Sequence, residues 1–454
     1  MDQIKTYRMF IACGLANLGY LILGICIAWT SPMTPRLREH TDDSPLTDKI
    51  SDSQDGWISS LLSVGAIIGC PIAGPLYDRI GRKWTLLSSS FLFAASFVLL
   101  ILGNNIWFIY VARVLQGIGC GLVNTTSPIY NAETATDNLR GAIGSLMTIL
   151  MIGGILFVYC IGPYVRYVTL QWFCLATPII FFVTFIFMPE SPYYYALKNQ
   201  SQKGIKSLQF LRGQSPKTAE EEMSRIQKAV DEDMSNKGNI SEILKNRAYK
   251  KAFVICIGLL TFQQFSGTTA VTFNSQSIFT SAQSNLDPAI ATIIMGLVQL
   301  VANLITPFVV DRAGRKIILM IAALGMCLSL AALGTFFYIQ KFGDASNILW
   351  IPIPALSIFY AMYAFGFGPI PSIIMGEILP SNIKSTVSSS ATTFHWVAQF
   401  MVTRWYPELN ALGSYIAFWM FGGFCAAAFF FVHFVVVETK GLSLQRIQEK
   451  LYAA

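Results

Sequence analysis

The chain has 454 residues, of which 54% are hydrophobic and 13% are charged, with a formal net charge of +7. Soluble domains carry about 25% charged residues, so this composition excludes a soluble globular class and indicates a chain solvated mostly by lipid. The sequence holds no basic stripe interleaved with aromatic residues, which excludes nucleic acid as a partner.

Twelve predominantly apolar stretches are long enough to cross a bilayer. The first lacks a small-residue cleavage site, so we interpret it as a membrane helix and not as a signal peptide. The predicted fold class is therefore all-α integral membrane, with twelve transmembrane helices. Their approximate limits are 7–29, 57–77, 84–102, 106–128, 141–163, 167–188, 252–279, 288–310, 317–339, 348–376, 386–405 and 411–437.

The spans divide into an N-terminal six-helix half at 1–190 and a C-terminal six-helix half at 252–437. A linker with short helices at 191–251 joins the halves, and a tail follows at 438–454. If the N-terminus is inside, the short inner loops hold thirteen Lys and Arg residues and the outer loops hold five. The positive-inside rule therefore predicts that both termini and the linker are cytoplasmic. We expect a multi-pass protein of the plasma membrane.

The linker contains a sequence pattern for one amphipathic helix. Thr218-x-x-Glu221 predicts a capping-box start. Met223, Ile226, Val230 and Met234 then recur at helical spacing. This helix either latches the two halves on the cytoplasmic face or is a solvated linker.

A charged motif occurs twice in equivalent places. Asp78-Arg79-x-Gly81-Arg82-Lys83 lies between two apolar runs and returns as Asp311-Arg312-x-Gly314-Arg315-Lys316. Glu133 precedes Arg140 by seven residues, as Glu377 precedes Lys384, and Glu190 and Glu438 close the two halves. Such an internal repeat is typical of a transporter built from two membrane halves.

We expect these charges to act as a gating salt-bridge network. They should pair when the cytoplasmic helix ends are close, stabilise the outward-open state, and separate when the cavity opens inward. The alternative for any single member is an anchor at the membrane interface. The network comprises Asp78, Arg79, Arg82, Glu133, Arg140, Glu190, Asp311, Arg312, Arg315, Glu377, Lys384 and Glu438.

Polar side chains in the middle of spans indicate a cavity for a solute. Span seven offers Gln263, Gln264, Ser266, Thr269 and Asn274, span eight offers Gln299, and span eleven offers His395, Trp396 and Gln399. Amides both donate and accept hydrogen bonds, which suits sugar hydroxyls, and Gly267 permits a local break in the helix. The alternative for an isolated polar residue is a hydrogen bond between helices.

No covalent chemistry, metal or cofactor is expected, and the chain is not predicted to be an enzyme. The nine cysteines fall in apolar runs without C-x-x-C spacing, so we interpret them as buried hydrophobic residues. The sequence contains no Gly-Lys dipeptide and hence no Walker A loop, which argues against ATP as a partner. A monomer is sufficient for this mechanism, and the sequence leaves the oligomeric state open.

The chain resembles the sugar porters of the major facilitator superfamily nearly from end to end, and most of all the insect facilitated trehalose transporter branch. Pro189-Glu190-Ser191-Pro192, Gln263-Gln264-x-Ser266-Gly267 and Glu438-Thr439-Lys440-Gly441 together are specific to sugar porters. The resemblance implies that Gln263, Gln264, Gln299, Trp396 and Gln399 contact sugar.

The sequence departs from the family at five lining positions. Thr148 replaces a Gln, Thr269 an Asn, Asn274 a Tyr, Ser372 an aromatic residue and His395 an Asn. We include these five in the predicted substrate site.

Proton-driven relatives keep a carboxylate in the first span, whereas the stretch 7–29 has no Asp or Glu. The predicted function is therefore passive, facilitated transport of a neutral sugar, trehalose or a hexose, by alternating access. A sugar sensor without transport is one alternative, and a transporter of a polyol or other small solute is another.

Overall fold

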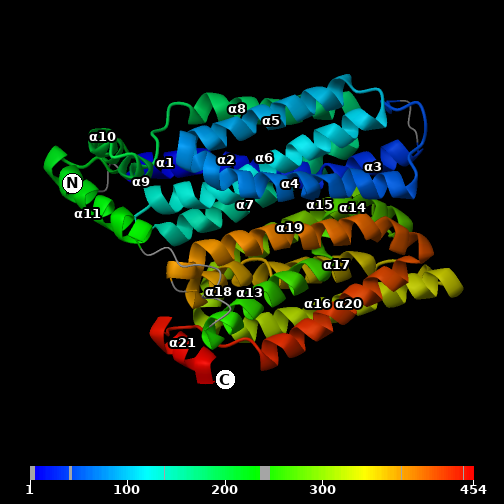
Figure 1. Cartoon of the computed structure of the whole chain (residues 1–454). Helices are drawn as coiled ribbons and strands as arrows, with labels where there is room; N and C mark the ends of the chain where they lie inside the picture. Colours follow the sequence, from blue (N-terminus) through cyan, green and yellow to red (C-terminus); the bar gives the residue numbers. More distant parts are fainter. Residues whose placement is uncertain are drawn as a thin grey trace. The chain divides into compact units, whose positions relative to one another are not determined.

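The computed structural model describes residues 6–39, 43–136, 139–235, 246–379, 381–442 and 444–453. These residues form α-helices and two short 3₁₀ turns, η1 (Gly162–Tyr164) and η2 (Ser346–Ile348). Figure 1 shows the helices, which are α1 (Thr6–Ala16), α2 (Leu18–Ala28), α3 (Thr30–Glu39), α4 (Asp52–Ile80), α5 (Arg82–Leu102), α6 (Ile106–Thr134), α7 (Arg140–Ile161), α8 (Tyr167–Phe185), α9 (Pro192–Leu197), α10 (Ser201–Arg212), α11 (Pro216–Ser235), α13 (Arg247–Phe265), α14 (Thr268–Ala282), α15 (Pro288–Ala313), α16 (Arg315–Phe342), α17 (Pro352–Phe365), α18 (Ile370–Ile378), α19 (Ser381–Leu412), α20 (Ser414–Phe434) and α21 (Leu444–Ala453).

Within the described residues, eleven helical stretches are long and apolar enough to cross a membrane. Each overlaps one predicted span, so the expected fold class is confirmed. The twelfth predicted span, 386–405, lies within α19. Serine, threonine and other polar residues keep the hydropathy of α19 below that of the other eleven.

Three of the spans are interrupted. The first is divided into α1, α2 and α3, the seventh into α13 and α14, and the tenth into α17 and α18. The break in the seventh span falls at Gly267, whose φ of 83° is readily adopted only by glycine. A Cβ atom at this position would also lie 2.4 Å from the ring of Phe421. The predicted break at Gly267 is therefore confirmed.

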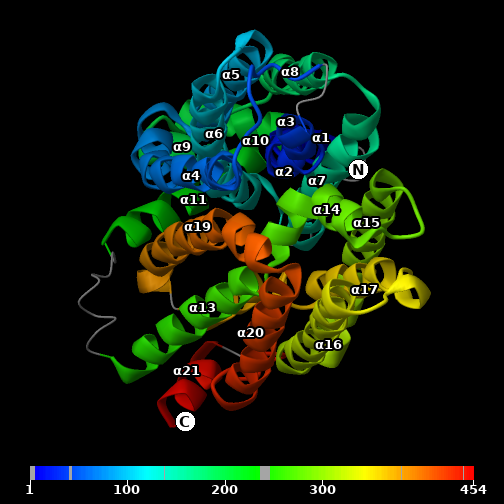
Figure 2. The same cartoon turned by 90° about the vertical axis from the view of Figure 1, so that its right-hand side faces the viewer.

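The helices pack into two compact units. The first consists of residues 1–26, 64–154 and 168–237, and the second of residues 27–63, 155–167 and 238–454. In the first unit α5 packs along α6, and in the second α16 packs along both α17 and α20 (Figures 1 and 2). The bounds of these two units differ from those of the predicted six-helix halves at 1–190 and 252–437. The prediction of two halves therefore still rests on the sequence repeat.

The linker helices α9, α10 and α11 share a small apolar core in the first unit. Met223, Ile226 and Val230 of α11 are buried there against Ala196 and Leu208, which confirms the predicted amphipathic helix, while the side chain of Met234 lies outside the described part of the chain. The predicted capping box is wrong, because α11 already begins at Pro216. Ser215 caps it instead, accepting a hydrogen bond of 3.3 Å from the Thr218 amide. Its predicted role as a latch stays a prediction.

Candidate functional site

The charged network of the first unit is built around the N-terminus of α5. Arg82 Nη2 lies 2.9 Å from Glu133 Oε1, and the Ser191 hydroxyl donates to the same carboxylate. Glu190 accepts hydrogen bonds from the backbone amides of Arg82, Lys83 and Ser191 at 2.9 to 3.1 Å. A carboxylate at this position satisfies amides that a helix start leaves unpaired and interacts favourably with the helix dipole.

The second unit repeats this arrangement at the N-terminus of α16. Arg315 Nη2 lies 3.1 Å from Glu377 Oε1, and the Thr439 hydroxyl donates to Glu377 Oε2 at 2.5 Å. Glu438 accepts from the amides of Arg315, Lys316, Thr439 and Lys440 at 2.9 to 3.1 Å. The repeat that is visible in the sequence is therefore also a repeat of hydrogen bonds.

Both turns need glycine. Gly81 and Gly314 have φ values of 101° and 96°. A Cβ atom would lie 2.1 Å from Glu190 at the first position and 2.9 Å from Glu438 at the second. The glycine in each motif thus lets the backbone turn and lets the carboxylate approach the helix start.

The pKa values of the two capping acids are shifted in opposite directions. Burial raises the pKa of Glu190 above its ordinary value, and the backbone amides and Arg82 offset this only in part. Burial also acts to raise the pKa of Glu438, but less strongly, and its four amide donors outweigh it, so that pKa is lowered. Glu190 is only 6% exposed, whereas Glu438 is half-buried.

The remaining members of the predicted network lie at its edge. Asp78 is exposed, 3.8 Å from Arg82, and Arg79 and Arg312 are exposed. The side chains of Arg140, Asp311 and Lys384 lie outside the described part of the chain. The ion pairs of Arg82 and Arg315 each join two residues of one unit. Pairing from one half to the other stays a prediction.

The predicted sugar site has a core of polar side chains on α13, α14 and α19 in the second unit. Gln264 Nε2 lies 3.1 Å from the His395 ring, and the Thr269 hydroxyl donates to Gln264 Oε1 at 2.9 Å. Gln263 Nε2 donates to the carbonyls of Phe367 and Gly368 at 2.6 and 3.2 Å. These carbonyls lie at the break between α17 and α18, where the helix leaves them without an intrahelical donor.

Three buried polar atoms of the predicted site have no hydrogen-bond partner among the described residues. They are Gln263 Oε1, Trp396 Nε1 and Gln399 Nε2. The three side chains are 3 to 6% exposed. Because most buried polar groups in proteins are satisfied, an acceptor and two donors left free on neighbouring helices indicate a place for a polar ligand or for water.

The other predicted lining residues are more scattered. Gln299 is buried on α15, and Asn274 donates to the Ala270 carbonyl of its own helix at 2.9 Å. Ser372 is exposed on α18, and Thr148 is half-buried on α7 in the first unit. The structure thus brings Gln264, Thr269 and His395 into one hydrogen-bonded cluster. Gln263 is bonded instead to the break between α17 and α18, and Trp396 and Gln399 follow on α19.

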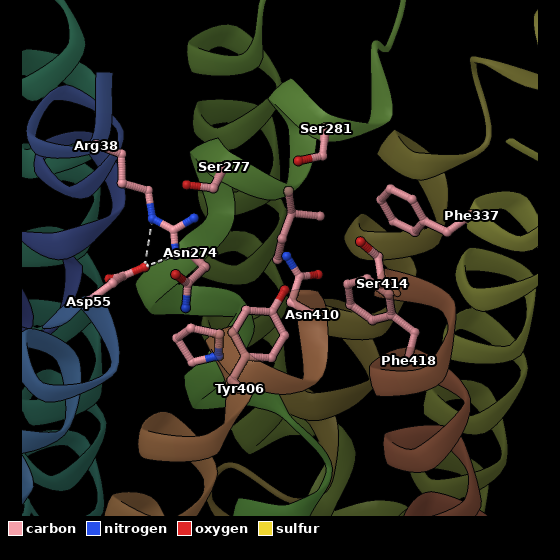
Figure 3. A pocket seen from close by; sticks show the side chains of 12 residues that line it. Arg38, Asp55, Asn274, Ser277, Ser281, Phe337, Tyr406, Asn410, Ser414 and Phe418 are labelled. Carbon is pink, nitrogen blue, oxygen red and sulfur yellow. Dashed lines mark hydrogen bonds and ion pairs between the residues drawn. The ribbon is translucent and has the colours of Figure 1, made fainter. Parts of the chain in front are cut away.

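A small polar pocket in the second unit was missed by the sequence analysis (Figure 3). Arg38 of α3 forms two hydrogen bonds, of 3.0 and 2.6 Å, with Asp55 of α4, which is 1% exposed. Tyr406 and Asn410 of α19 also line it. The signal was an acid inside the helix that spans the membrane, but the predicted span began at residue 57, so Asp55 was assigned to a loop.

Comparisons with known proteins agree with this architecture. The sugar (and other) transporter family matches residues 11–451. The facilitated trehalose transporter Tret1 of Apis mellifera ligustica is 36% identical over 98% of this chain and 88% of its own length. Tret1 of Polypedilum vanderplanki is 33% identical over 99% and 89%. Tret1 of Anopheles gambiae is 34% identical, but the match covers only 57% of that longer protein.

Solved structures show the same fold. The xylose transporter XylE from E. coli, in a partially occluded inward open conformation, matches with a TM-score of 0.82 and 23% identity over 96% of this chain and 100% of that one. The proton:xylose symporter XylE bound to 6-bromo-6-deoxy-D-glucose matches with a TM-score of 0.77 and 23% identity over 98% and 100%. The fold is thus that of the major facilitator superfamily, and the chain belongs to the sugar transporter family of multi-pass membrane proteins.

Proposed function

We propose that this protein lets a neutral sugar, trehalose or a hexose, cross the plasma membrane down its gradient by alternating access. The observation that carries the proposal is the set of free buried atoms at Gln263, Trp396 and Gln399. A donor and acceptor set without a net charge fits hydroxyl groups and gives no preference for an ion. The trehalose transporters among the relatives support a disaccharide as one candidate.

The absence of proton coupling rests on the first span. Residues 7–29 contain no Asp or Glu that could load and release a proton within the membrane. Uptake by proteoliposomes should therefore continue when a protonophore removes the proton gradient. Uptake that stops under these conditions would contradict passive transport.

The duplicated charged network is proposed to control the conformational equilibrium on the cytoplasmic side, where both termini should also lie. A partly shielded network of this kind biases such an equilibrium by an amount on the order of 1–3 kcal/mol, which shifts populations without locking one state.

The test of the function is flux of labelled trehalose and glucose into proteoliposomes, compared with empty liposomes. Saturable uptake that equilibrates without accumulation is expected. The five departures in the predicted lining keep a sugar sensor as a second candidate, and saturable binding without flux would favour it.

A further inference from the structure

The small pocket lies at one end of the second unit, formed by α3, α4, α14, α16, α19 and α20. It is distinct from the Gln264–His395 cluster, although Asn274 connects the two through α14. The helix is kinked at Asn274, whose φ and ψ are −121° and 16°. This end holds the loops that precede α4 and α15, which the positive-inside rule places outside the cell.

The floor of the pocket is buried and its rim is exposed. Asn274 is 5% exposed and Tyr406 2%, whereas Ser281 at the rim is exposed. In Figure 3, Arg38 and Asp55 lie on one side and Phe337 and Phe418 on the other, with Asn274, Tyr406 and Asn410 between them. The pocket therefore extends from the surface to buried residues of α14 and α19.

One polar atom of the floor has no partner in the structure as described. The Tyr406 hydroxyl is buried and makes no hydrogen bond. Burying a hydroxyl without an acceptor is unfavourable, so this position calls for a ligand atom or a water molecule. The pocket leaves about 20 Å³ for the centre of a water-sized molecule, which is enough for one water or one hydroxyl group.

The charges of the lining indicate a neutral ligand. Among the lining residues, Arg38 and Asp55 carry opposite charges and are bonded to each other, and Arg38 also pairs with Asp52, which does not line the pocket. The other polar lining groups are hydroxyls and amides, and Phe337 and Phe418 stack at 5.4 Å to give an apolar wall. Hydroxyl and amide groups beside an aromatic wall suit a polyhydroxy compound.

We propose that this pocket is an outer subsite that binds a hydroxyl-bearing part of the transported sugar on the extracellular side of the predicted central site. The inference rests on the proposed function and names a second place where that sugar is held. Asn274 lines the pocket from α14, the helix that also carries Thr269 of the predicted site.

The test separates the two faces of the membrane. Labelled trehalose, or glucose if trehalose is not carried, is measured in influx and in efflux with oriented proteoliposomes. Tyr406→Phe removes only the hydroxyl, and the loss of one hydrogen bond should raise the half-saturation concentration for influx about fivefold. In efflux the half-saturation concentration should change by less than about twofold. The maximum rate of efflux should fall, because in a passive carrier the maximum rate divided by the half-saturation concentration must be the same for influx and efflux.

Asn410→Ala should act in the same direction, because Asn410 lines the same pocket. Tyr452→Phe is the matched control, since Tyr452 is 63% exposed on α21 and should change neither direction. Half-saturation that rises equally in influx and efflux would place the hydroxyl at the central site and overturn the proposal. Unchanged kinetics would show that the pocket holds water only and would also overturn it.

If the unmodified protein carries no sugar, the proposed function is contradicted, but the proposed subsite can still be tested on its own. The subsite is then tested by the thermal stabilisation that the same sugars give the detergent-solubilised protein. Stabilisation that weakens in Tyr406→Phe supports the subsite, whereas stabilisation that is absent or insensitive to this change contradicts it.

Discussion

A substitution at Trp396 tests one polar atom of the predicted site, the indole Nε1. Its indole is 3% exposed, and Nε1 has no hydrogen-bond partner among the described residues. Trp396→Phe keeps an aromatic ring but removes the N–H donor. We expect the half-saturation concentration for sugar uptake to rise roughly 2- to 12-fold, which corresponds to one hydrogen bond.

The measurement is uptake normalised to the amount of inserted protein. Trp350→Phe is the control, because Trp350 is 59% exposed at the start of the tenth span. An unchanged half-saturation in Trp396→Phe would remove this residue from the site.

The two capping acids should respond to pH in opposite directions. Glu438 has a lowered pKa, so its carboxylate stabilises the fold above the ordinary glutamate value of about 4.3, and this is lost as pH falls through the lowered pKa. Glu190 has a raised pKa, so its contribution is largest at low pH and is lost as pH rises through the raised value.

Thermal unfolding of the detergent-solubilised protein from pH 7 to about pH 3 checks this, because the Glu438 contribution is lost only below the ordinary glutamate value of about 4.3. The stability advantage of the unmodified protein over Glu438→Gln should shrink as the pH falls. Its stability relative to Glu190→Gln should improve over the same range. Parallel pH profiles of the two variants would contradict the assigned environments.

At the scale of elements, the break between α13 and α14 positions the polar cluster. Gln264 lies before the break and Thr269 after it, and their side chains are bonded across it. Gly267→Ala would introduce a Cβ atom that meets the Phe421 ring at a positive φ. We expect a loss of stability of about 1–3 kcal/mol and reduced sugar uptake.

Thermal unfolding and uptake are measured together on the same preparation. Gly423→Ala serves as the control, because a Cβ atom there meets nothing within 4 Å inside α20. That change should leave the protein as stable or slightly more stable. A Gly267→Ala protein with normal stability and flux would show that the break tolerates a side chain.

Sequence patterns predicted the membrane helices and the break at Gly267, but not the cap of α11 or the Arg38–Asp55 pair. The helices could be predicted because an apolar run of about 20 residues is typical of a membrane span. The break could be predicted because Gly267 follows two glutamines within such a span. The capping of α11 was misassigned because Ser215 and Thr218 both suit a cap, and only the position of Pro216 decides between them. Asp55 alone was visible as an acid near the start of the second span, but its pairing with Arg38 depends on how α3 and α4 pack, which no local pattern contains.

At the scale of the whole molecule, the question is whether the two charged networks act together. The Arg82–Glu133 and Arg315–Glu377 pairs are each internal to one unit. If each network only stabilises its own turn, then the free-energy effects of Arg82→Ala and Arg315→Ala should add within about 0.5 kcal/mol. If both stabilise one closed state of the cytoplasmic side, we expect a coupling energy larger than this.

A double-mutant cycle on transport rate and on thermal stability distinguishes these outcomes. We expect additive stabilities, because the pairs are local, and coupled transport rates, because the proposed gate uses both. Additive transport rates would contradict gating by a shared network. The conservative Arg315→Lys variant controls for the charge alone, since lysine cannot reproduce the planar fork of arginine.

The polar composition of α19 has a consequence for biosynthesis. Helices enter the bilayer during synthesis according to their transfer free energy, and α19 lacks the hydropathy of the eleven other spans. It should therefore partition poorly on its own and depend on neighbours such as α13 and α20 for its final insertion. The polar residues of α19, among them the predicted sugar contacts, would then make its insertion depend on the helices around it.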